Sequence, residues 1–386
     1  MRRVLVNRKG ADRIASGHPW IFASDVTDRG DAEPGDTVFV FDPRDKPVGT
    51  FHYSSTSQIT LRQLSPRLEE TGYEFFRNRI LRALEHRARV VEGTEASRLI
   101  YGEADGLPAL IVDRYGRQLV LQALSQGMDR ACATVVRILQ ELLSPDAIVA
   151  RNDVAVRRLE GLPAETTVLS GAVAGTELVT LNGLRWHVDL LHGQKTGIYL
   201  DQRENYLAAA RWARGNVLDC FTSTGGFALH LARVCPEVEG VDSGEAVLAS
   251  ARRNADTNAI TNVRWQEADV FNVLPAYAQA GKRFGTVVLD PPAFAKSKSA
   301  IEGAARGYRD INYRALRLLE PGGILVSCSC SFHFSEAMLL ETVAAAALDA
   351  GRRLRVLERR MQALDHPVLL TVPETLYLKC LIFEVI

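Results

Sequence analysis

The chain has 386 residues, of which 47% are hydrophobic and 24% are charged, and its 46 basic side chains balance its 46 acidic ones. The length predicts two or three domains with sizeable cores, and the formal net charge of +0 argues against unspecific coating of nucleic acid without excluding a local basic patch. No run of 18 apolar residues is present and "MRRVLVNRKG" lacks the apolar core of a signal peptide, so we expect a cytoplasmic protein with no membrane partner.

Residues 1–70 are predicted to form a small β-barrel-like domain, because "DTVFVFDPRDKPVGTFHYS" reads as two strands joined by an Asp-Pro turn. The segment before it interleaves basic residues with Trp20 and Phe22. That composition suits RNA, through phosphate contacts and base stacking. Packing in the core is the alternative for both aromatic side chains, and Trp20 is the candidate RNA contact.

Residues 71–190 are predicted to form a central α+β domain. The stretch "EFFRNRILRALEHRARVV" has the apolar period of a helix. Its arginines are expected on a basic surface that is either solvated or faces RNA: Arg77, Arg79, Arg82, Arg87 and Arg89. Hairpins are expected around Tyr115-Gly116 and at the turn Asn182-Gly183.

Residues 191–386 alternate strands with helices, which predicts an α/β fold with a mostly parallel sheet covered by helices on both faces. The last two strands, "RLRVLER" and "YLKCLIFEVI", are expected to form an antiparallel hairpin with a short link. In such sheets ligands bind beyond the carboxyl ends of the strands, so the residues that follow each strand are the candidates for a site.

Glycines and acids follow the first three of these strands. "DCFTSTGGF" allows a tight turn but is neither a dinucleotide fingerprint nor a Walker loop, so a nucleoside without a diphosphate fits better. Asp242 is placed to accept ribose hydroxyls and Asp269 to accept an adenine amine, although either acid alone could simply be an N-cap. The ordered series resembles the class I S-adenosylmethionine-dependent methyltransferases. The candidate donor-binding residues are Phe221, Thr222, Thr224, Gly225, Gly226, Asp242, Ser243, Asp269, Val270 and Asp290.

Upstream of the first strand, "HGQKTGIYLDQRENY" is dense in functional groups. A capped helix start explains Asp201 but not the whole run. We therefore expect the polar side chains of this run to line the donor or base pocket: Lys195, Tyr199, Asp201, Gln202 and Arg203.

The fourth strand is followed by "LDPPAFAKSKS", which predicts a rigid wall for a planar base. Pro291 and Pro292 stiffen the chain, and Phe294 is placed to stack on a flipped or single-stranded base. Lys296 and Lys298 are candidate phosphate contacts, with a solvated loop as the alternative.

The fifth strand ends in "SCSCSF", where Cys328 and Cys330 form the only close pair of the six cysteines. No second Cys or His pair completes a zinc set, so we expect no metal. A thiolate that adds to C6 of a pyrimidine activates C5 toward a methyl donor, which is covalent catalysis of the usual cysteine kind. Cys330, deeper in the turn, is the expected nucleophile. Asp290, with a pKa raised by burial, is expected to donate to N3 of cytosine.

Six segments together resemble the bacterial 23S rRNA (cytosine-C5)-methyltransferase family: "HGQKTGIYLDQR", "DCFTSTGGFAL", "DPPAFAKSK", "RGYRDIN", "SCSCSF" and "DHPVLLTVPETLYLK". "GHPWIFASDV" resembles the RNA-binding PUA domain of that family, and "DGLPALIVDRYG" its central segment. The resemblance covers nearly the whole chain.

The resemblance implies a PUA domain (1–70), a central α+β domain (71–190) and a Rossmann-like class I methyltransferase domain (191–386). It also implies S-adenosylmethionine as donor, 23S rRNA as partner, a homodimer, and methylation of one cytosine, number 1962 in reference rRNA numbering. The family nucleophile falls on Cys330. Cys328 departs from the family pattern, and its role stays open. Many related enzymes carry a second cysteine after the strand-four proline, but this chain has Pro292 or Ala293 there, so another base must remove the C5 proton.

The sequence leaves three alternative functions. A related branch with a similar "DPP-x-F" loop methylates guanine N7, which needs no thiol, and the cysteines count against it. A small-molecule methyltransferase is disfavoured by the PUA-like domain. An RNA-binding protein with an inactive catalytic domain is disfavoured by the intact series of glycines and acids.

Overall fold

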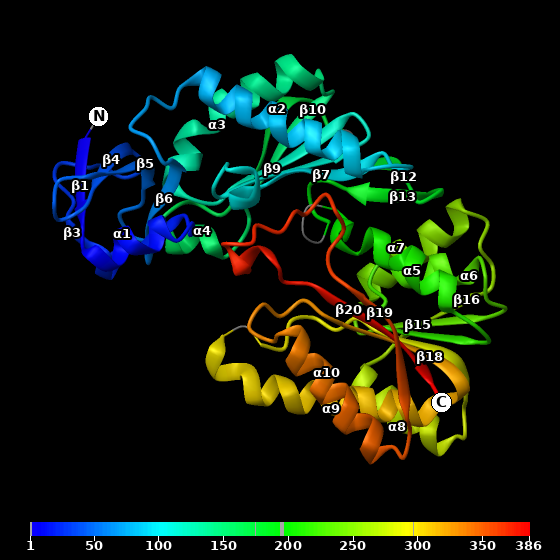
Figure 1. Ribbon diagram of the computed structural model, residues 1–386. Coiled ribbons are helices and arrows are strands. Elements are labelled where there is room, and N and C mark those ends of the chain that lie inside the picture. The colour runs from blue at the N-terminus through cyan, green and yellow to red at the C-terminus, as the bar shows by residue number, and fades with distance from the viewer. Residues whose placement is uncertain (1, 174, 194–196, 296) are drawn as a thin grey trace. The chain divides into compact units, whose positions relative to one another are not determined.

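The chain folds into two compact units, each assembled from separated segments of sequence (Figure 1). In this computed structural model the described residues are 2–173, 175–193, 197–295 and 297–386. Unit 1 consists of Met1–Thr180, Val188–Ile198 and Leu364–Thr375, and unit 2 of Leu181–His187, Tyr199–Ala363 and Leu376–Ile386. The three-domain division at residues 71 and 191 stays a prediction. Among the described residues, no helix is both long and apolar enough to cross a bilayer.

The first part of unit 1 is a six-stranded sheet in the order β2-β6-β5-β4-β1-β3. Alternating apolar side chains form its core, which contains Val38, Val40 and Phe51. The elements are β1 (Arg2–Val6), α1 (Arg8–Ala15), β2 (Trp20–Phe22), β3 (Val26–Asp28), β4 (Thr37–Phe41), β5 (Pro47–Tyr53) and β6 (Ile59–Ser65). This sheet agrees with the predicted β-rich N-terminal module.

The second part of unit 1 is a five-stranded sheet in the order β11-β10-β9-β8-β7, against which α2 and α3 pack. The elements are α2 (Tyr73–Val90), β7 (Ala96–Tyr101), β8 (Leu110–Tyr115), β9 (Gln118–Ala123), α3 (Gln126–Leu143), β10 (Ala147–Arg151), α4 (Val156–Leu159) and β11 (Thr166–Gly171). A separate hairpin, β12 (Thr176–Leu181) and β13 (Leu184–Asp189), turns at Asn182-Gly183 as expected.

One arginine of α2 is not on the surface, contrary to expectation. Arg87 is only 3% exposed, because its guanidinium donates to the carboxylate of Asp105 and to the backbone oxygens of Arg98 and Asp365. Asp365 comes from the 364–375 segment, and its carboxylate also accepts the backbone N–H of Arg98 at 2.9 Å. Unit 1 is therefore completed by residues close to the end of the chain.

Unit 2 contains a seven-stranded sheet in the order β16-β15-β14-β17-β18-β20-β19. Its first five strands are parallel, and β20 and β19 close it in antiparallel fashion, as expected. The strands are β14 (Val217–Cys220), β15 (Val238–Asp242), β16 (Val263–Glu267), β17 (Phe284–Leu289), β18 (Leu319–Ser329), β19 (Leu354–Arg360) and β20 (Lys379–Val385). The link between the last two strands is not short, because residues 364–375 belong to unit 1.

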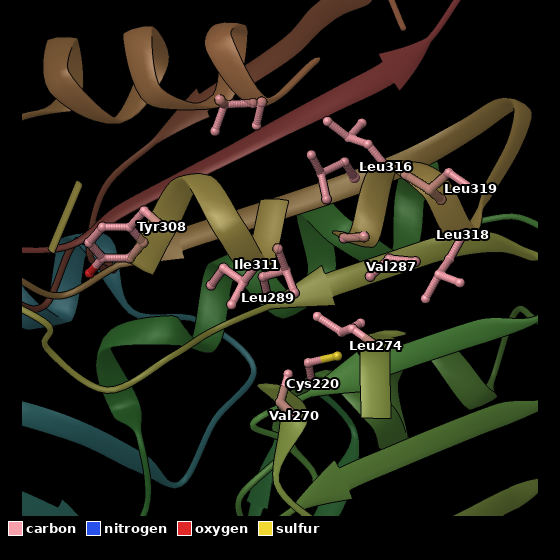
Figure 2. Close-up of a cluster of buried hydrophobic side chains, with 14 of the residues drawn as sticks. Cys220, Val270, Leu274, Val287, Leu289, Tyr308, Ile311, Leu316, Leu318 and Leu319 are labelled. Atoms are coloured by element: carbon pink, nitrogen blue, oxygen red, sulfur yellow. The ribbon is translucent and has the colours of Figure 1, made fainter. Parts of the chain in front are cut away.

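Helices cover both faces of this sheet: α5, α6 and α7 lie on one side and α8, α9 and α10 on the other (Figure 1). They are α5 (Arg203–Trp212), α6 (Gly226–Ala232), α7 (Glu245–Thr257), α8 (Val270–Gln279), α9 (Ile301–Leu318) and α10 (Glu336–Asp349). Figure 2 shows the core under the second group, where Ile311 of α9 lies beside Leu289 of β17 and Leu274 of α8 lies near Cys220 of β14. This packed layer holds the strand ends in place.

Candidate active site

The carboxyl ends of β14, β15, β17 and β18 carry most of the residues singled out from the sequence. These strands are neighbours and parallel, so their ends meet at one edge of the sheet. The site described below lies entirely within unit 2.

The loop after β14 is held in an unusual backbone conformation. Phe221 (φ 63°), Ser223 (φ 51°) and Gly225 (φ 91°) all lie in the left-handed region, which only glycine adopts readily. The buried carboxylate of Asp219 stabilises this loop: its Oδ2 accepts hydrogen bonds from Thr222 Oγ1 at 2.5 Å and Ala228 N at 3.0 Å. Burial raises the pKa of Asp219 to about 7. Sequence reasoning missed this residue, although it stands in the quoted "DCFTSTGGF".

Asp242, at the end of β15, joins that loop to the next. Its Oδ2 accepts the N–H of Ser223 at 2.9 Å and its Oδ1 accepts the N–H of Gly244 at 3.1 Å. Each carboxylate oxygen can accept a second hydrogen bond, so two backbone donors do not exhaust the group. The neighbouring Ser243 is exposed, and Thr224 accepts a hydrogen bond from Asn254 through its backbone oxygen.

Asp269 and Val270 begin α8. Asp269 is exposed and accepts the N–H of Phe271 at 2.9 Å, so it is the N-cap that the sequence left as an alternative. Capping leaves its second oxygen available for a ligand. The side chain of Val270 is 2% exposed and packs in the core, so only its backbone is available.

The 199–203 segment brings polar side chains against Asp290. Gln202 Nε2 donates to Asp290 Oδ2 at 3.0 Å, and Gln202 Oε1 accepts from Asn205 at 2.7 Å. Arg360 in turn donates to Asn205 Oδ1 at 2.9 Å, which fixes the orientation of both amides. The carboxylate of Asp290 is therefore oriented by a hydrogen-bonded chain that the sequence did not reveal. Arg203 is buried at the start of α5.

Tyr199 lies among the groups predicted to bind donor and target. Burial raises the pKa of its phenol, and the nearby Asp290, Asp201, Cys330 and Asp242 raise it further, in that order. Its phenol therefore stays protonated at neutral pH and can donate a hydrogen bond.

The two cysteines of "SCSCSF" occupy different environments. Cys328 is fully buried in β18, directly opposite Cys380 of β20, and burial raises the pKa of its thiol well above the usual range. Cys330 lies just beyond the end of the strand and is partly exposed, with Sγ 3.9 Å from the backbone oxygen of Pro291. Only Cys330 is accessible to a ligand at this edge.

The serines of the same motif connect it to its neighbours. Tyr308 Oη of α9 lies 2.8 Å from Ser329 Oγ and 3.2 Å from Ser331 Oγ, and Ser331 Oγ also accepts the N–H of Ala295 at 3.1 Å. The partly exposed Phe294 packs its ring 4.7 Å from that of Tyr308. These contacts join the loop after β17 to the end of β18.

The two proline residues of that loop differ in exposure: Pro291 is buried and Pro292 is exposed. Sequence reasoning also gave no role to Lys379, the first residue of β20. Its Nζ donates to the backbone oxygens of Ser331 at 2.6 Å and Tyr377 at 2.8 Å. Burial lowers the pKa of Lys379 to about 8.

Four predicted RNA contacts are not part of this described site. Lys195 and Lys296 lie outside the described residues, and Lys298 is exposed in the loop after β17. Trp20 belongs to unit 1, where it is half-buried and its indole N–H donates to Glu103 Oε1 at 2.9 Å.

Comparison with known proteins agrees with this arrangement. Residues 4–66 match the family model of a PUA-like domain, and residues 135–383 match that of S-adenosylmethionine-dependent methyltransferases. The chain is 40% identical to ribosomal RNA large subunit methyltransferase I of Klebsiella pneumoniae subsp. pneumoniae, over 97% of this chain and 96% of the relative. Identity to the protein of the same name from Shigella dysenteriae serotype 1 is also 40%, over 97% of each.

Two solved structures share the fold over the full length of both chains, at 18% identity. One is described as a methyltransferase complexed with SAH (TM-score 0.86), and the other as a SAM-dependent methyltransferase from Streptococcus mutans (TM-score 0.84).

Proposed function

Because the chain belongs to the ribosomal RNA large subunit methyltransferase I family, whose cofactor is S-adenosylmethionine, we propose that it methylates C5 of a cytosine in 23S rRNA through a covalent bond to Cys330. The observation that carries the proposal is the unequal exposure of the two thiols: Cys330 is open to a ligand beside the Asp290 loop, while Cys328 is sealed in the sheet.

The covalent route answers a chemical difficulty, because C5 of cytosine is a weak nucleophile. The Cys330 thiolate forms a bond to C6, and the electron pair of the C5–C6 double bond becomes available at C5. Asp290, oriented by Gln202, donates a proton to N3 as the adduct forms. The bound donor supplies an electrophilic methyl group. After transfer a base takes the C5 proton, and the C5–C6 double bond re-forms as the C6–S bond breaks to return the thiolate. N3 then gives its proton back to the Asp290 carboxylate, which restores the acid for the next cycle.

The residues beyond β14 and β15 fit a nucleoside donor without a diphosphate. Gly225 lets the chain turn closely into α6, where a Cβ would lie 2.9 Å from the ring of Trp265. The Asp242 carboxylate keeps acceptor capacity for ribose hydroxyls. In the same loop, Ser223 Oγ is buried without a hydrogen-bond partner among the described residues. We assign donor binding to this loop together with Asp242, Asp269, Tyr199 and Gln202.

The target base is proposed to lie against the exposed Pro292 and the partly exposed Phe294. Both belong to the loop whose Pro291 carbonyl oxygen lies 3.9 Å from Cys330 Sγ. A flipped or single-stranded cytosine needs such a wall for stacking. Lys195 is proposed to line the donor or base pocket, and Lys296 and Lys298 are proposed to contact phosphates of the RNA. Trp20 is proposed as an RNA contact of the PUA-like domain, with its indole N–H already engaged by Glu103.

A trapping experiment tests the covalent step. RNA carrying 5-fluorocytosine at the target blocks loss of the C5 substituent, so wild-type enzyme with S-adenosylmethionine is expected to form an adduct stable in denaturing gels. Cys330→Ala is expected to form none and to yield no product, while its affinity for the donor, measured by calorimetry, is unchanged.

Cys328→Ala is the matched control, because it removes the neighbouring thiol but leaves the proposed nucleophile. It is expected to form the adduct and the product. An active Cys330→Ala enzyme would end the covalent proposal, and 7-methylguanine in its product would point instead to guanine-N7 methylation, which needs no thiol.

We further propose that the target is cytosine 1962 in reference rRNA numbering, and that the enzyme acts in the cytoplasm as a homodimer. Mass mapping of rRNA from a strain lacking the enzyme is expected to show loss of one 5-methylcytosine at that position. Sedimentation equilibrium of the purified chain is expected to give twice the monomer mass, and a monomer would contradict the dimer.

A further inference from the structure

Lys379 is a buried lysine in an unusual setting. It is 4% exposed at the start of β20, opposite Ser329 in the β18–β20 ladder. Among the described residues, no carboxylate lies within ion-pair distance of its ammonium group. Lysine is rarely buried without a charged partner, because desolvating the ammonium is unfavourable. A buried lysine at the edge of a candidate active site therefore suggests a role in that site.

Its contacts point to the chain around Cys330. Two donors of the ammonium are used by backbone oxygens, Ser331 at 2.6 Å and Tyr377 at 2.8 Å. Ser331 directly follows Cys330, and its hydroxyl is held by Tyr308 and by the N–H of Ala295. Lys379 therefore anchors the backbone of the turn that carries the partly exposed thiol.

Among the described residues, a backbone oxygen and an acidic side chain near Cys330 disfavour a thiolate. Its Sγ lies 3.9 Å from the backbone oxygen of Pro291, which accepts hydrogen bonds but donates none. Tyr199 and Tyr308 lie close enough to feel a negative charge on Cys330, and Asp290 acts on the same Tyr199. Near Lys379 itself, Glu336 of α10 is paired with Arg359.

Lys379 is a cation placed against these groups. Burial lowers the pKa of Lys379 to about 8, while the thiolate of Cys330 and the carboxylate of Glu336 oppose that lowering. The lysine is thus mostly charged at pH 7 and loses its charge above pH 8. The interaction is reciprocal, so the charge that the thiolate favours on the lysine favours the thiolate in return.

We propose that Lys379 is a positioning residue for Cys330: its ammonium holds the turn after the cysteine through the Ser331 carbonyl and supplies a positive charge that favours the thiolate. The nucleophilic role of Cys330 rests on the proposed function, whereas the effect on its ionisation does not.

Alkylation of Cys330 by iodoacetamide tests the proposal without RNA or methyl donor. The rate is followed from pH 6 to 10 on the full-length protein, with the Cys330 peptide quantified by mass spectrometry. Lys379→Gln keeps an N–H donor for Ser331 and removes the charge, and Lys379→Met removes both. Both variants are expected to move the midpoint of the rate profile up by about one pH unit, equivalent to about tenfold slower alkylation below the midpoint.

Two controls separate this effect from general damage. Lys282→Met removes a lysine at the other end of the same sheet and is expected to leave the Cys330 profile unchanged. Cys235, buried in unit 2, serves as an internal reference, because its alkylation is expected to rise in a variant that loosens this unit. Lys379→Arg keeps a positive charge, so the midpoint of its alkylation profile is expected to return most of the way to that of wild type. If Lys379→Met does not fold, Lys379→Gln carries the test.

An unchanged midpoint in folded Lys379→Gln would overturn the role of the charge. That result is distinguishable from failure of the covalent mechanism, which is decided by the activity of Cys330→Ala. A shifted alkylation profile combined with an active Cys330→Ala enzyme would support the lysine–thiol interaction and reject the catalytic use of the thiol.

Discussion

The two ends of the seven-stranded sheet in unit 2 differ in how their charges are used. At the amino end a cavity of about 520 Å³ is lined by the first residues of β14, β15, β16 and β17. Its main carboxylate, Glu239, is paired with Arg264 at 2.8 Å and Lys282 at 3.3 Å. At the carboxyl end, Asp219 and Lys379 are buried, and their hydrogen-bond partners among the described residues are neutral. Both side chains have shifted pKa values.

This contrast shows that the presence of a cavity does not by itself identify the candidate active site. At the amino end Glu239 and its two cations are engaged with one another. At the carboxyl end a strained loop and two buried ionisable groups are maintained against their intrinsic preferences. Substitutions at the carboxyl end should therefore change catalysis, donor binding or pH response, and those at the amino end should change stability alone.

Apart from Cys330→Ala, the largest effect is expected for Asp290→Asn. The amide keeps an acceptor for Gln202 but cannot act as the proton donor, so single-turnover methylation should slow by roughly 100- to 10,000-fold. Rapid-quench measurement with saturating RNA and donor checks this. A wild-type methylation rate in this variant would show that Asp290 is not the proton donor, and it would weaken the contrast between the two ends of the sheet.

Asp219→Asn is expected to change the pH dependence of stability. The folded-state pKa is about 7, above the ordinary value of 3.8, so the folded protein binds more protons between these values and loses stability as pH rises from 4 to 7. The amide keeps an acceptor oxygen for Thr222 and does not titrate. Relative to wild type, the variant should gain up to about 4 kcal/mol across that window. Urea unfolding at pH 4, 5.5 and 7 measures the free energy of unfolding of both proteins. An equal pH dependence in wild type and variant would contradict the raised pKa of Asp219.

Asp242→Asn should weaken donor binding by about tenfold, because a hydrogen bond to a charged group contributes about 1.5–3 kcal/mol and the amide retains part of it. Calorimetry with S-adenosylmethionine gives the dissociation constant. The methylation rate at saturating donor should stay near that of wild type. Equal donor affinity in the variant and in wild type would show that Asp242 does not bind the ribose of the donor.

The smallest effect is expected at the amino end. Glu239→Gln removes the charge that pairs with Arg264 and Lys282 but keeps an acceptor for Tyr277. Because both cations are substantially exposed, the free energy of unfolding should fall by about 1 kcal/mol or less. Methylation rate and donor affinity should not change, and a slower enzyme would show that this end is coupled to the site.

The residues at the carboxyl ends of the strands could be predicted from the sequence, because the alternation of strands and helices along the chain determines which residues follow each strand. Alternation of strands and helices places Gly225, Asp242 and Asp290 at one edge whatever the packing details. Two-residue spacing could not separate Cys328 from Cys330, since the difference arises where β18 ends and Cys330 leaves the ladder opposite Cys380.

Contacts between residues that are distant in the sequence could not be predicted, because they depend on tertiary packing. Lys379 is far from Cys330 in sequence, and only the insertion of β20 beside β18 brings it to Ser331. The hydrogen-bonded chain from Arg360 through Asn205 to Gln202 likewise depends on tertiary packing. The expected basic face of α2 was wrong at Arg87 because its partner, Asp365, lies far along the chain.

The contribution of residues 364–375 to unit 1 has a consequence for biosynthesis. Domains usually fold in order as they emerge from the ribosome. Here Arg87 and Arg98 are made early, but their partner Asp365 is translated only near the end. Unit 1 therefore acquires its full set of internal bonds only when nearly the whole chain has been made, and a nascent or C-terminally truncated chain carries a buried arginine without its final acceptor.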